Sequence, residues 1–300
     1  MNNKITKIGF AGLGQMGKHM ARNLLGPDVE LTVCNRSSGQ FASFAEDGAK
    51  TTTNPADLAG CDIIFLCLPG DDTVKTMLLG EKGLVSLARE RTIIVDCSTV
   101  SVAAAKEIAA ACRVKNIEFL DAPISGMEAR AKDGTLSIMV GGDTTTLEKA
   151  MPFLQRMGKT ITHMGEAGAG QLMKLINQLL FDVNMAALAE VLPMAVKMGL
   201  DPEKTGEIIN NGTGRSHASE FFIPRILKNS FVDGYPMENA YKDLVSGYFL
   251  SAMERVPLPV VQAATATYQS ALNKGLGKED KGAMIKVYEE LLGVQFRKRE

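Results

Sequence analysis

The chain has 300 residues, a length that suits two domains better than a single compact core. Its formal net charge is −1, and the charged residues are scattered along the chain, so they cannot build the basic face that nucleic-acid binding requires. Neither a secretory leader nor an unbroken run of about 18 apolar residues is visible, and we therefore expect a cytoplasmic protein without a membrane partner.

Short apolar runs alternate with helical periodicity in the first half of the chain. A run that is apolar without interruption, such as 63–68, is typical of a parallel strand buried on both faces. The alternation predicts a Rossmann-type α/β domain with a mostly parallel sheet. We expect strands at 7–12, 31–34, 63–68, 92–96, 119–123 and 137–140, and helices at 16–25 and 102–112.

The character of the chain changes after about residue 164. Three glycines at 165, 168 and 170 precede a long, mostly apolar segment, 171–198, in which only four side chains carry charge. A helix that is apolar nearly all round must be buried on most sides. The remaining sequence, to about residue 292, has helical periods and no strand pattern. We therefore predict an α/β domain over 1–165 and an all-α domain over 166–300.

The five cysteines all lie within the first 112 residues and form no CxxC pair. An odd number of cysteines in and beside apolar strands indicates reduced, buried thiols rather than disulfides or a metal site. At the other end of the chain, the basic run 297–299 is short and terminal, and we expect it to be a solvated tail.

A glycine-rich loop follows the first predicted strand and opens the first predicted helix. In such a loop the first glycine permits a tight turn, and the second lets the backbone approach a pyrophosphate. The third lets the helix pack closely, while the helix N–H groups face the phosphates. A glycine turn without a ligand is the alternative, which this context disfavours. The sequence predicts a dinucleotide-binding loop formed by Gly12, Leu13, Gly14, Gln15, Met16 and Gly17.

The end of the second predicted strand bears on which dinucleotide is bound. NAD-binding proteins place a carboxylate here against the ribose 2′-hydroxyl, but this chain has Asn35, Arg36 and Ser37. No carboxylate repels a 2′-phosphate, and the Arg36 guanidinium can bind one. NADP(H) is therefore favoured, while NAD(H) stays possible. Alternatively, Arg36 is an ordinary surface residue.

Hydride transfer between a nicotinamide dinucleotide and a carbonyl group needs an acid, and the reverse reaction needs a base. The residues alone do not clearly identify this group. The histidines, His19, His163 and His217, have no context typical of catalysis, and no HExxH motif or Cys/His cluster indicates a metal. Lys174 lies near the start of the long apolar helix, where burial would lower the pKa of an amine toward working pH. A lysine that extends from a buried helix to solvent fits the periodicity equally well.

Four segments of the chain resemble the β-hydroxyacid dehydrogenase family. This family includes 3-hydroxyisobutyrate dehydrogenase, tartronate semialdehyde reductase and the glyoxylate/succinic semialdehyde reductases. The segment 10–24 is similar to its N-terminal signature, 121–126 to its substrate-binding segment, 170–177 to its catalytic-lysine motif, and 242–244 to its late lysine motif. The resemblance covers nearly the whole chain.

The resemblance implies an NADP(H)-preferring oxidoreductase that interconverts a small β-hydroxy acid and its semialdehyde. The substrate would belong to the glyoxylate, succinic semialdehyde, tartronate semialdehyde or 3-hydroxyisobutyrate class, and the enzyme would be a homodimer or homotetramer. Domain 1–165 would bind the dinucleotide, and domain 166–300 would serve substrate binding and oligomerisation.

The resemblance also assigns roles to single residues. Lys174 would be the general acid/base, and Asn177 would help to place the reacting oxygen. The other implied contacts are Ser125 and Gly126 to the substrate carboxylate, Leu68 and Pro69 along the cofactor, Thr99 to the nicotinamide ribose, and Lys242 to the cofactor.

Two positions depart from the family pattern. Ala11 replaces a larger apolar residue, a packing change of little functional weight, and Met127 stands where many members have a second glycine. Its bulk beside the substrate leaves the identity of the substrate open. Two other functions remain as alternatives: an imine reductase, although relatives of that kind usually lack a lysine at position 174, and a dinucleotide-sensing module without turnover, which would be free to lose Lys174 and Ser125.

Overall fold

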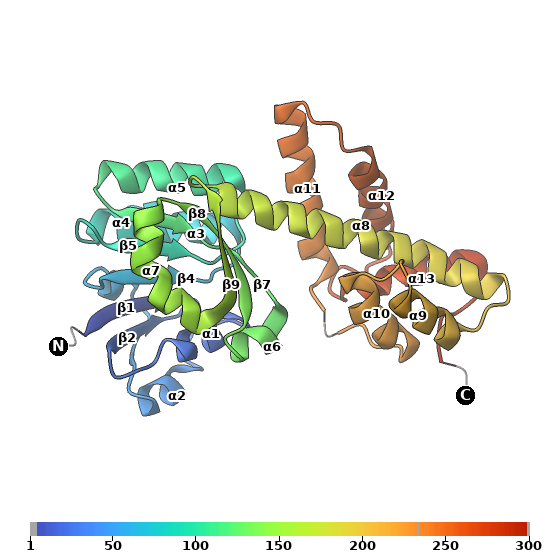
Figure 1. Ribbon diagram of the computed structural model, residues 1–300, viewed down its shortest axis with the longest axis horizontal. Coiled ribbons are helices and arrows are strands. Elements are labelled where there is room, and N and C mark those ends of the chain that lie inside the picture. The colour runs from blue at the N-terminus through green and yellow to red at the C-terminus, as the bar shows by residue number, and fades with distance from the viewer. Residues whose placement is uncertain (1–4, 233, 299–300) are drawn as a thin grey trace. The chain divides into compact units, whose positions relative to one another are not determined.

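The computed structural model describes residues 5–232 and 234–298, and the chain divides into two compact units. The N-terminal unit comprises Met1–Lys174, and the helical unit comprises Leu175–Glu300. In Figure 1 the N-terminal unit runs from blue to yellow-green and the helical unit from yellow to red.

The N-terminal unit is built on one twisted sheet in the order β3-β2-β1-β4-β5-β6-β8-β7, with β9 paired to β8. The pairs from β3 to β6 are parallel, whereas β8 is antiparallel to both β6 and β7. The order 3-2-1-4-5-6 is that of a dinucleotide-binding sheet. The strands are β1 Thr6–Ala11, β2 Val29–Cys34, β3 Lys50–Thr52, β4 Ile63–Leu66, β5 Ile93–Asp96, β6 Glu118–Asp121, β7 Ile124–Ser125, β8 Leu136–Gly142 and β9 Gly158–Gly165.

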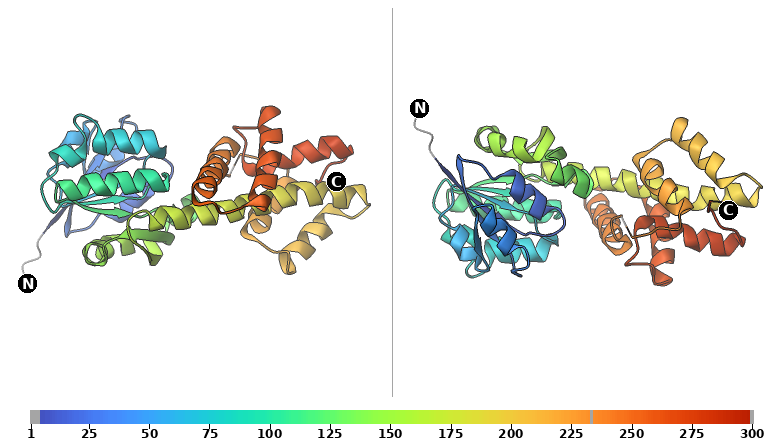
Figure 2. Two further views of the ribbon diagram at one scale, coloured as in Figure 1. Left: turned by 90° about the horizontal axis from the view of Figure 1, so that it is seen from above. Right: turned by 90° about the horizontal axis from the view of Figure 1, so that it is seen from below.

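Helices cover both faces of this sheet, as the two views of Figure 2 show. Successive side chains of a strand point to opposite faces, so Ile63 and Phe65 of β4 enter one apolar core while Ile64 and Leu66 enter the other. This burial on both faces explains why the strand sequences are apolar without interruption. The helices are α1 Gly17–Asn23, α2 Phe41–Glu46, η1 Pro55–Leu58, α3 Gly70–Leu79, α4 Leu84–Leu87, α5 Val102–Val114, α6 Met127–Lys132 and α7 Thr144–Met157.

The helical unit packs around the greater part of α8 (Ala169–Lys197), whose first turns belong to the N-terminal unit. The apolar side of α8, including Met185, Ala189 and Leu192, joins Phe222 and Tyr268 in a third core. The other helices are α9 Pro202–Asn211, α10 His217–Leu227, α11 Met237–Glu254, α12 Pro259–Asn273, η2 Lys281–Met284 and α13 Ile285–Leu292.

By length and composition alone, α8 could also cross a membrane. An 18-residue window of this helix has a mean hydropathy of 1.6. The core helix of a soluble protein passes the same test, however, and α8 carries a fully buried aspartate, Asp182, that pairs with Lys281. These contacts indicate a core helix of the helical unit.

The predicted strands and helices of the N-terminal unit are confirmed to within a few residues, but the short strands β3 and β7 and the longer β9 were not predicted, and the C-terminal tail differs from the expectation. The strand β9 escaped prediction because most of its side chains are exposed, so it has no apolar run. The prediction that residues 297–299 form a solvated tail is wrong for Arg297. Its guanidinium donates to both carboxylate oxygens of Glu289, at 2.6 and 2.9 Å. Arg299 lies outside the described residues. The five cysteines are free, and burial raises the pKa of each thiol, as predicted for packed thiols.

Candidate active site

The glycine-rich loop connects β1 to α1 and meets the end of β4. Gly12 has a φ of 99°, and a Cβ on it would lie 2.2 Å from the carbonyl oxygen of Cys67. A Cβ on Gly17 would lie 2.0 Å from the carbonyl oxygen of Gly12. A Cβ on Gly14, by contrast, would meet nothing within 4 Å. The first and third glycines are therefore required by close packing, and the second leaves open space where the backbone can be approached by a phosphate.

Asn35, directly after β2, holds the glycine-rich loop. Its Oδ1 accepts a hydrogen bond from the backbone N–H of Leu13 at 3.1 Å, and its Nδ2 donates to the carbonyl oxygen of Ser37 at 2.9 Å. Arg36 is exposed beside it. Asn35 thus holds the loop in place, whereas the Arg36 and Ser37 side chains beside it are exposed.

The other predicted cofactor residues of this unit follow the carboxyl ends of β4 and β5. The backbone N–H of Leu68 donates to Ser98 Oγ at 2.9 Å, which joins the two strand ends. Pro69 precedes α3, and Thr99 is half-buried in the loop after β5. Ligands of open α/β sheets bind outside the carboxyl ends of the strands, where the strand order reverses, and this sheet reverses between β1 and β4.

The predicted carboxylate-binding segment has an unusual backbone. Ser125 ends β7, Gly126 has a φ of 144°, and Met127 has a φ of 61° at the start of α6. A left-handed conformation costs an L-residue with a Cβ about 1–2 kcal/mol, and glycine avoids this cost. A glycine at position 127 would adopt this backbone without strain, whereas Met127 adopts it at a conformational cost.

Glu128 links this segment to the glycine-rich loop, a contact that the sequence did not reveal. Its carboxylate lies 2.8 Å from Lys18 Nζ, 2.9 Å from His19 Nε2 and 3.0 Å from Gln15 Nε2. Hydrogen bonds from Lys18, His19 and Gln15 lower the pKa of Glu128 from 4.5 to about 2. The helix α6 is therefore tied to the start of α1 by an ionised carboxylate.

Lys174 lies in the first turns of α8, which are anchored at the ends of β5 and β6. Asp121, fully buried, accepts hydrogen bonds from the backbone N–H groups of Gly168 at 2.7 Å and Gln171 at 2.9 Å. Lys174 itself is only 9% exposed. A lysine that extends its amine freely into solvent would be more exposed than this.

Asp96 is a second buried carboxylate at this edge that the sequence did not reveal as special. It lies beside Asp121 in the β5–β6 register, and its Oδ1 accepts the backbone N–H of Ser98 at 3.0 Å. Its Oδ2 has no hydrogen-bond partner among the described residues. Burial raises the pKa of Asp96 from 3.8 to about 6.

Two predicted site residues belong to the helical unit. Asn177 Nδ2 donates to Gln178 Oε1 at 3.3 Å, and Gln178 Nε2 donates to Asp243 Oδ2 on α11 at 3.2 Å. Lys242, the residue before Asp243, is exposed. All the other predicted site residues, Lys174 included, belong to the N-terminal unit.

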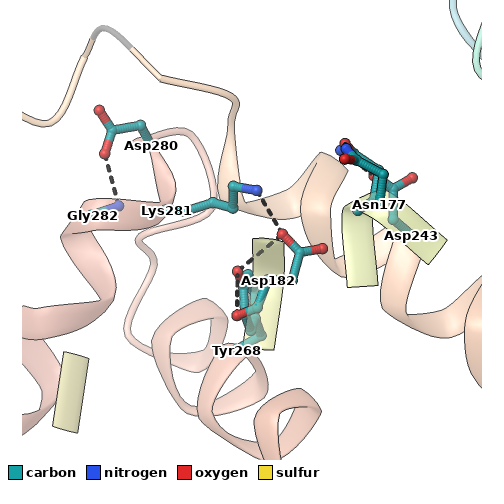
Figure 3. Close-up of polar contacts among 8 residues, drawn as sticks. Asn177, Asp182, Asp243, Tyr268, Asp280, Lys281 and Gly282 are labelled. Carbon is teal, nitrogen blue, oxygen red and sulfur yellow. Dashed lines mark hydrogen bonds and ion pairs between the residues drawn. The ribbon is translucent and has the colours of Figure 1, made fainter. Parts of the chain in front are cut away.

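The helical unit also holds a buried ion pair, which Figure 3 shows in close-up. Lys281 Nζ on η2 lies 2.6 Å from Asp182 Oδ1 on α8, and both side chains are fully buried. The Tyr268 hydroxyl donates to the same oxygen at 3.3 Å, and the ammonium lies 3.6 Å from the centre of the Phe181 ring. Burial raises the pKa of Asp182 to about 6 and lowers that of Lys281.

Each of the three histidines has a contact within its own unit. His19 bonds to Glu128, and His163 Nε2 lies 2.8 Å from the carbonyl oxygen of Gly142. The His217 ring packs 5.4 Å from that of Phe181. Among residues 5–232 and 234–298, no group of three or more His, Cys, Asp or Glu side chains could hold a metal ion.

Two family models match the chain over most of its length. Residues 7–165 match a model described as the NAD binding domain of 6-phosphogluconate dehydrogenase. Residues 168–288 match one described as the NAD-binding region of NADP-dependent 3-hydroxyisobutyrate dehydrogenase.

Individual proteins are similar over nearly the whole chain. The 2-(hydroxymethyl)glutarate dehydrogenase of Eubacterium barkeri is 40% identical over 293 residues, which cover 97% of each chain. Two 3-hydroxyisobutyrate dehydrogenases of solved structure share the fold. That of Salmonella typhimurium is 28% identical with a TM-score of 0.85, covering 94% of this chain and 99% of the other. That of Mycobacterium tuberculosis, studied with L-serine, is 30% identical with a TM-score of 0.84, covering 94% and 98%.

Proposed function

Because the chain belongs to the β-hydroxyacid dehydrogenase family, and so is a nicotinamide-dinucleotide-dependent oxidoreductase acting on hydroxyl groups, we propose that it interconverts a small β-hydroxy acid and its semialdehyde. NADP(H) would be the preferred cofactor, and Lys174 would be the general acid/base. The observation that carries the proposal is the burial of Lys174 on a helix anchored at the carboxyl ends of β5 and β6.

The names of the relatives point to one reacting unit. 2-(Hydroxymethyl)glutarate, 3-hydroxyisobutyrate and L-serine all contain a hydroxymethyl group on the carbon that bears a carboxylate. They differ only in the third substituent, which is a carboxyethyl, methyl or ammonium group. We propose that this chain acts on the same HO–CH2–CH(R)–COO⁻ unit, and that glyoxylate, succinic semialdehyde and tartronate semialdehyde are further candidates on the aldehyde side.

The N-terminal unit supplies groups suited to hold the dinucleotide. The loop from Gly12 to Gly17 would bind the pyrophosphate, with Gly14 as the point of closest approach. Leu68 and Pro69 would line the path to the nicotinamide, and Thr99 would contact the nicotinamide ribose. From the helical unit, Lys242 would add a contact to the cofactor.

Cofactor preference rests on the end of β2. Asn35 is engaged with the loop, and no carboxylate follows β2 that would repel a 2′-phosphate. The exposed Arg36 guanidinium can bind that phosphate with two donors, with Ser37 beside it. We therefore propose that NADP(H) binds more tightly than NAD(H).

The reaction requires one proton to move with the hydride. The nicotinamide dinucleotide, when bound, supplies or accepts the hydride. In the reducing direction, the Lys174 ammonium donates a proton to the carbonyl oxygen, which becomes the hydroxyl. In the oxidising direction, the neutral amine accepts the hydroxyl proton. Ser125 and Gly126 would hold the carboxylate through hydroxyl and N–H donors, and Asn177 would orient the reacting oxygen.

We further propose a cytoplasmic homodimer or homotetramer, in which residues 1–165 bind the dinucleotide and 166–300 contribute substrate and subunit contacts. An exposed apolar stripe on α8 supports subunit contacts. Four apolar side chains fall within about 60° on one side of this helix, and each is at least 42% exposed: Ile176, Leu180, Val191 and Met194. Light scattering of the purified protein would test this, and a monomer at micromolar concentration would refute it.

The test of the catalytic proposal is a substrate panel followed at the nicotinamide absorbance. Purified protein is assayed with 2-(hydroxymethyl)glutarate, 3-hydroxyisobutyrate, L-serine, glyoxylate and succinic semialdehyde, each with both cofactors. Lys174→Ala should lower kcat at least about a hundredfold with little change in NADPH affinity, since a positioned acid/base contributes 10²–10⁴-fold. Lys197→Ala, on the exposed end of the same helix, is the matched control and should keep full activity.

The same assay separates the alternatives. Turnover of cyclic imines but not of carboxylated aldehydes would favour an imine reductase. NADPH binding without turnover of any substrate would favour a sensing module. Normal turnover by Lys174→Ala would assign the acid to another residue.

A further inference from the structure

We propose that Gln171 is a positioning residue, which fixes Lys174 relative to the loop that carries Thr99. The inference rests on the proposed role of Lys174. It concerns a side chain that would touch neither substrate nor cofactor and acts through the backbone of its neighbours.

Both polar atoms of the Gln171 side chain are used, and they bind on either side of Thr99. Its Nε2 donates to the carbonyl oxygen of Ser98 at 2.7 Å, and its Oε1 accepts the backbone N–H of Val100 at 3.2 Å. The side chain is 1% exposed. A single amide therefore holds the two peptide groups that flank Thr99 and leaves the Thr99 side chain, which is half-buried, on the loop between them.

Gln171 also reaches the neighbouring strand end through Ser98. The Ser98 hydroxyl accepts the backbone N–H of Leu68 after β4, and the Ser98 N–H donates to Asp96 Oδ1. The hydrogen bonds thus run from the end of β4, through the end of β5, to the first turn of α8. The network thus joins Leu68 and the two peptide groups that flank Thr99 to Gln171, which lies three residues before Lys174 on α8.

The helix that carries Gln171 cannot shift easily, because its start is pressed against the sheet. Asp121 accepts the N–H groups of Gly168 and Gln171. A Cβ on Gly170 would lie 2.4 Å from the carbonyl oxygen of Met139 on β8 and 2.7 Å from that of Asp121. Backbone this close leaves the first turn of α8 little freedom to rotate or slide.

Lys174 follows Gln171 by three residues, which is about 4.5 Å along a helix and nearly one turn. Residues at this spacing lie on the same side of a helix. Because the start of α8 is held against the sheet, the Gln171 amide fixes the loop after β5 relative to the side of the helix from which the Lys174 amine leaves. A displacement of about 1 Å in a reacting group can cost about a hundredfold in rate.

The test compares Gln171→Met, which keeps the length of the side chain and removes both hydrogen bonds, with Gln155→Met, an exposed glutamine of α7 in the same unit. We expect Gln171→Met to lower kcat between about tenfold and a hundredfold, with NADPH affinity, measured by fluorescence titration, within about threefold of the original. Gln155→Met should change neither. Gln171→Asn, one methylene shorter, should give the same pattern and serves if the methionine variant does not fold.

A double variant separates positioning from a general structural effect. If Gln171 acts through Lys174, then Gln171→Met should lower kcat by less than about twofold in a Lys174→Ala background, because interacting residues are not additive. An undiminished loss in that background, or an unchanged kcat in the single variant, would overturn the inference. If Lys174→Ala alone keeps normal turnover, the proposed function fails instead, so the two failures are distinguishable.

Discussion

Replacing Lys281 with methionine should strongly destabilise the helical unit. The ammonium and the Asp182 carboxylate are 2.6 Å apart and fully buried, so removal of the lysine leaves a buried charge without its partner. Breaking a buried pair in this way costs about 3–5 kcal/mol. The ammonium also lies 3.6 Å from the centre of the Phe181 ring, and that contact is part of the same loss. Since domains unfold with about 5–15 kcal/mol, the expected loss is a large fraction of the total.

The same variant should depend on pH in a defined direction. In the intact protein, burial already raises the pKa of Asp182 from 3.8 to about 6, although Lys281 opposes the shift. Without Lys281 the pKa rises further. A carboxyl whose pKa is higher in the folded protein than in the unfolded chain contributes stability that is present at low pH and lost as the pH rises through the folded value. Lys281→Met should therefore become more stable as the pH is lowered from 8 to 5.

The chain offers a selective assay for this unit. All five tyrosines lie between residues 235 and 288, and the sequence contains no tryptophan. Tyrosine fluorescence during urea unfolding therefore reports on the helical unit alone. The double variant Asp182→Asn/Lys281→Met removes both charges and should recover most of the loss. The control Lys274→Met breaks an exposed pair with Glu290 and should cost less than about 1 kcal/mol.

Two results would refute this reasoning. A loss below about 1 kcal/mol in Lys281→Met would mean that the pair is not buried and ionised in solution. A double variant no more stable than the single one would mean that the two side chains are not coupled.

Three further predictions concern the N-terminal unit. Arg36→Ala should raise the Kd for NADPH much more than that for NADH, and equal changes in fluorescence titrations would remove Arg36 from the phosphate site. Hydrogen bonds lower the pKa of Glu128 from 4.5 to about 2, so the ionised carboxylate stabilises the fold above pH 4.5 and this stabilisation is lost as the pH falls toward 2. The melting temperature of Glu128→Gln should not show this loss between pH 4.5 and pH 2. Met127→Gly should keep or raise the melting temperature, whereas the β-branched Met127→Val should lower the free energy of unfolding by about 1 kcal/mol or more. The opposite order of stability would show that the left-handed backbone at this position carries no strain.

Local patterns determined the architecture of the N-terminal unit and its dinucleotide loop. Strands buried on both faces need apolar residues at every position, and a turn packed as closely as that at Gly12 and Gly17 admits only glycine. Such requirements are met by neighbouring residues, so they are visible in a short stretch of sequence. Lys174 could be singled out for the same reason, since it is a charged residue near the start of an apolar helix. The resemblance of segment 170–177 to a family motif then predicted that it is the general acid/base.

The supporting contacts were decided by the tertiary structure. Glu128 meets His19 across 109 residues, Gln171 meets Val100 across 71, and Lys281 meets Asp182 across 99. Periodicity indicates which face of an element is buried, but it does not indicate which distant side chain will face a polar group there. A buried glutamine or lysine is tolerated only when a partner satisfies it. That partner is chosen by the packing of whole elements, which no short stretch of the chain contains.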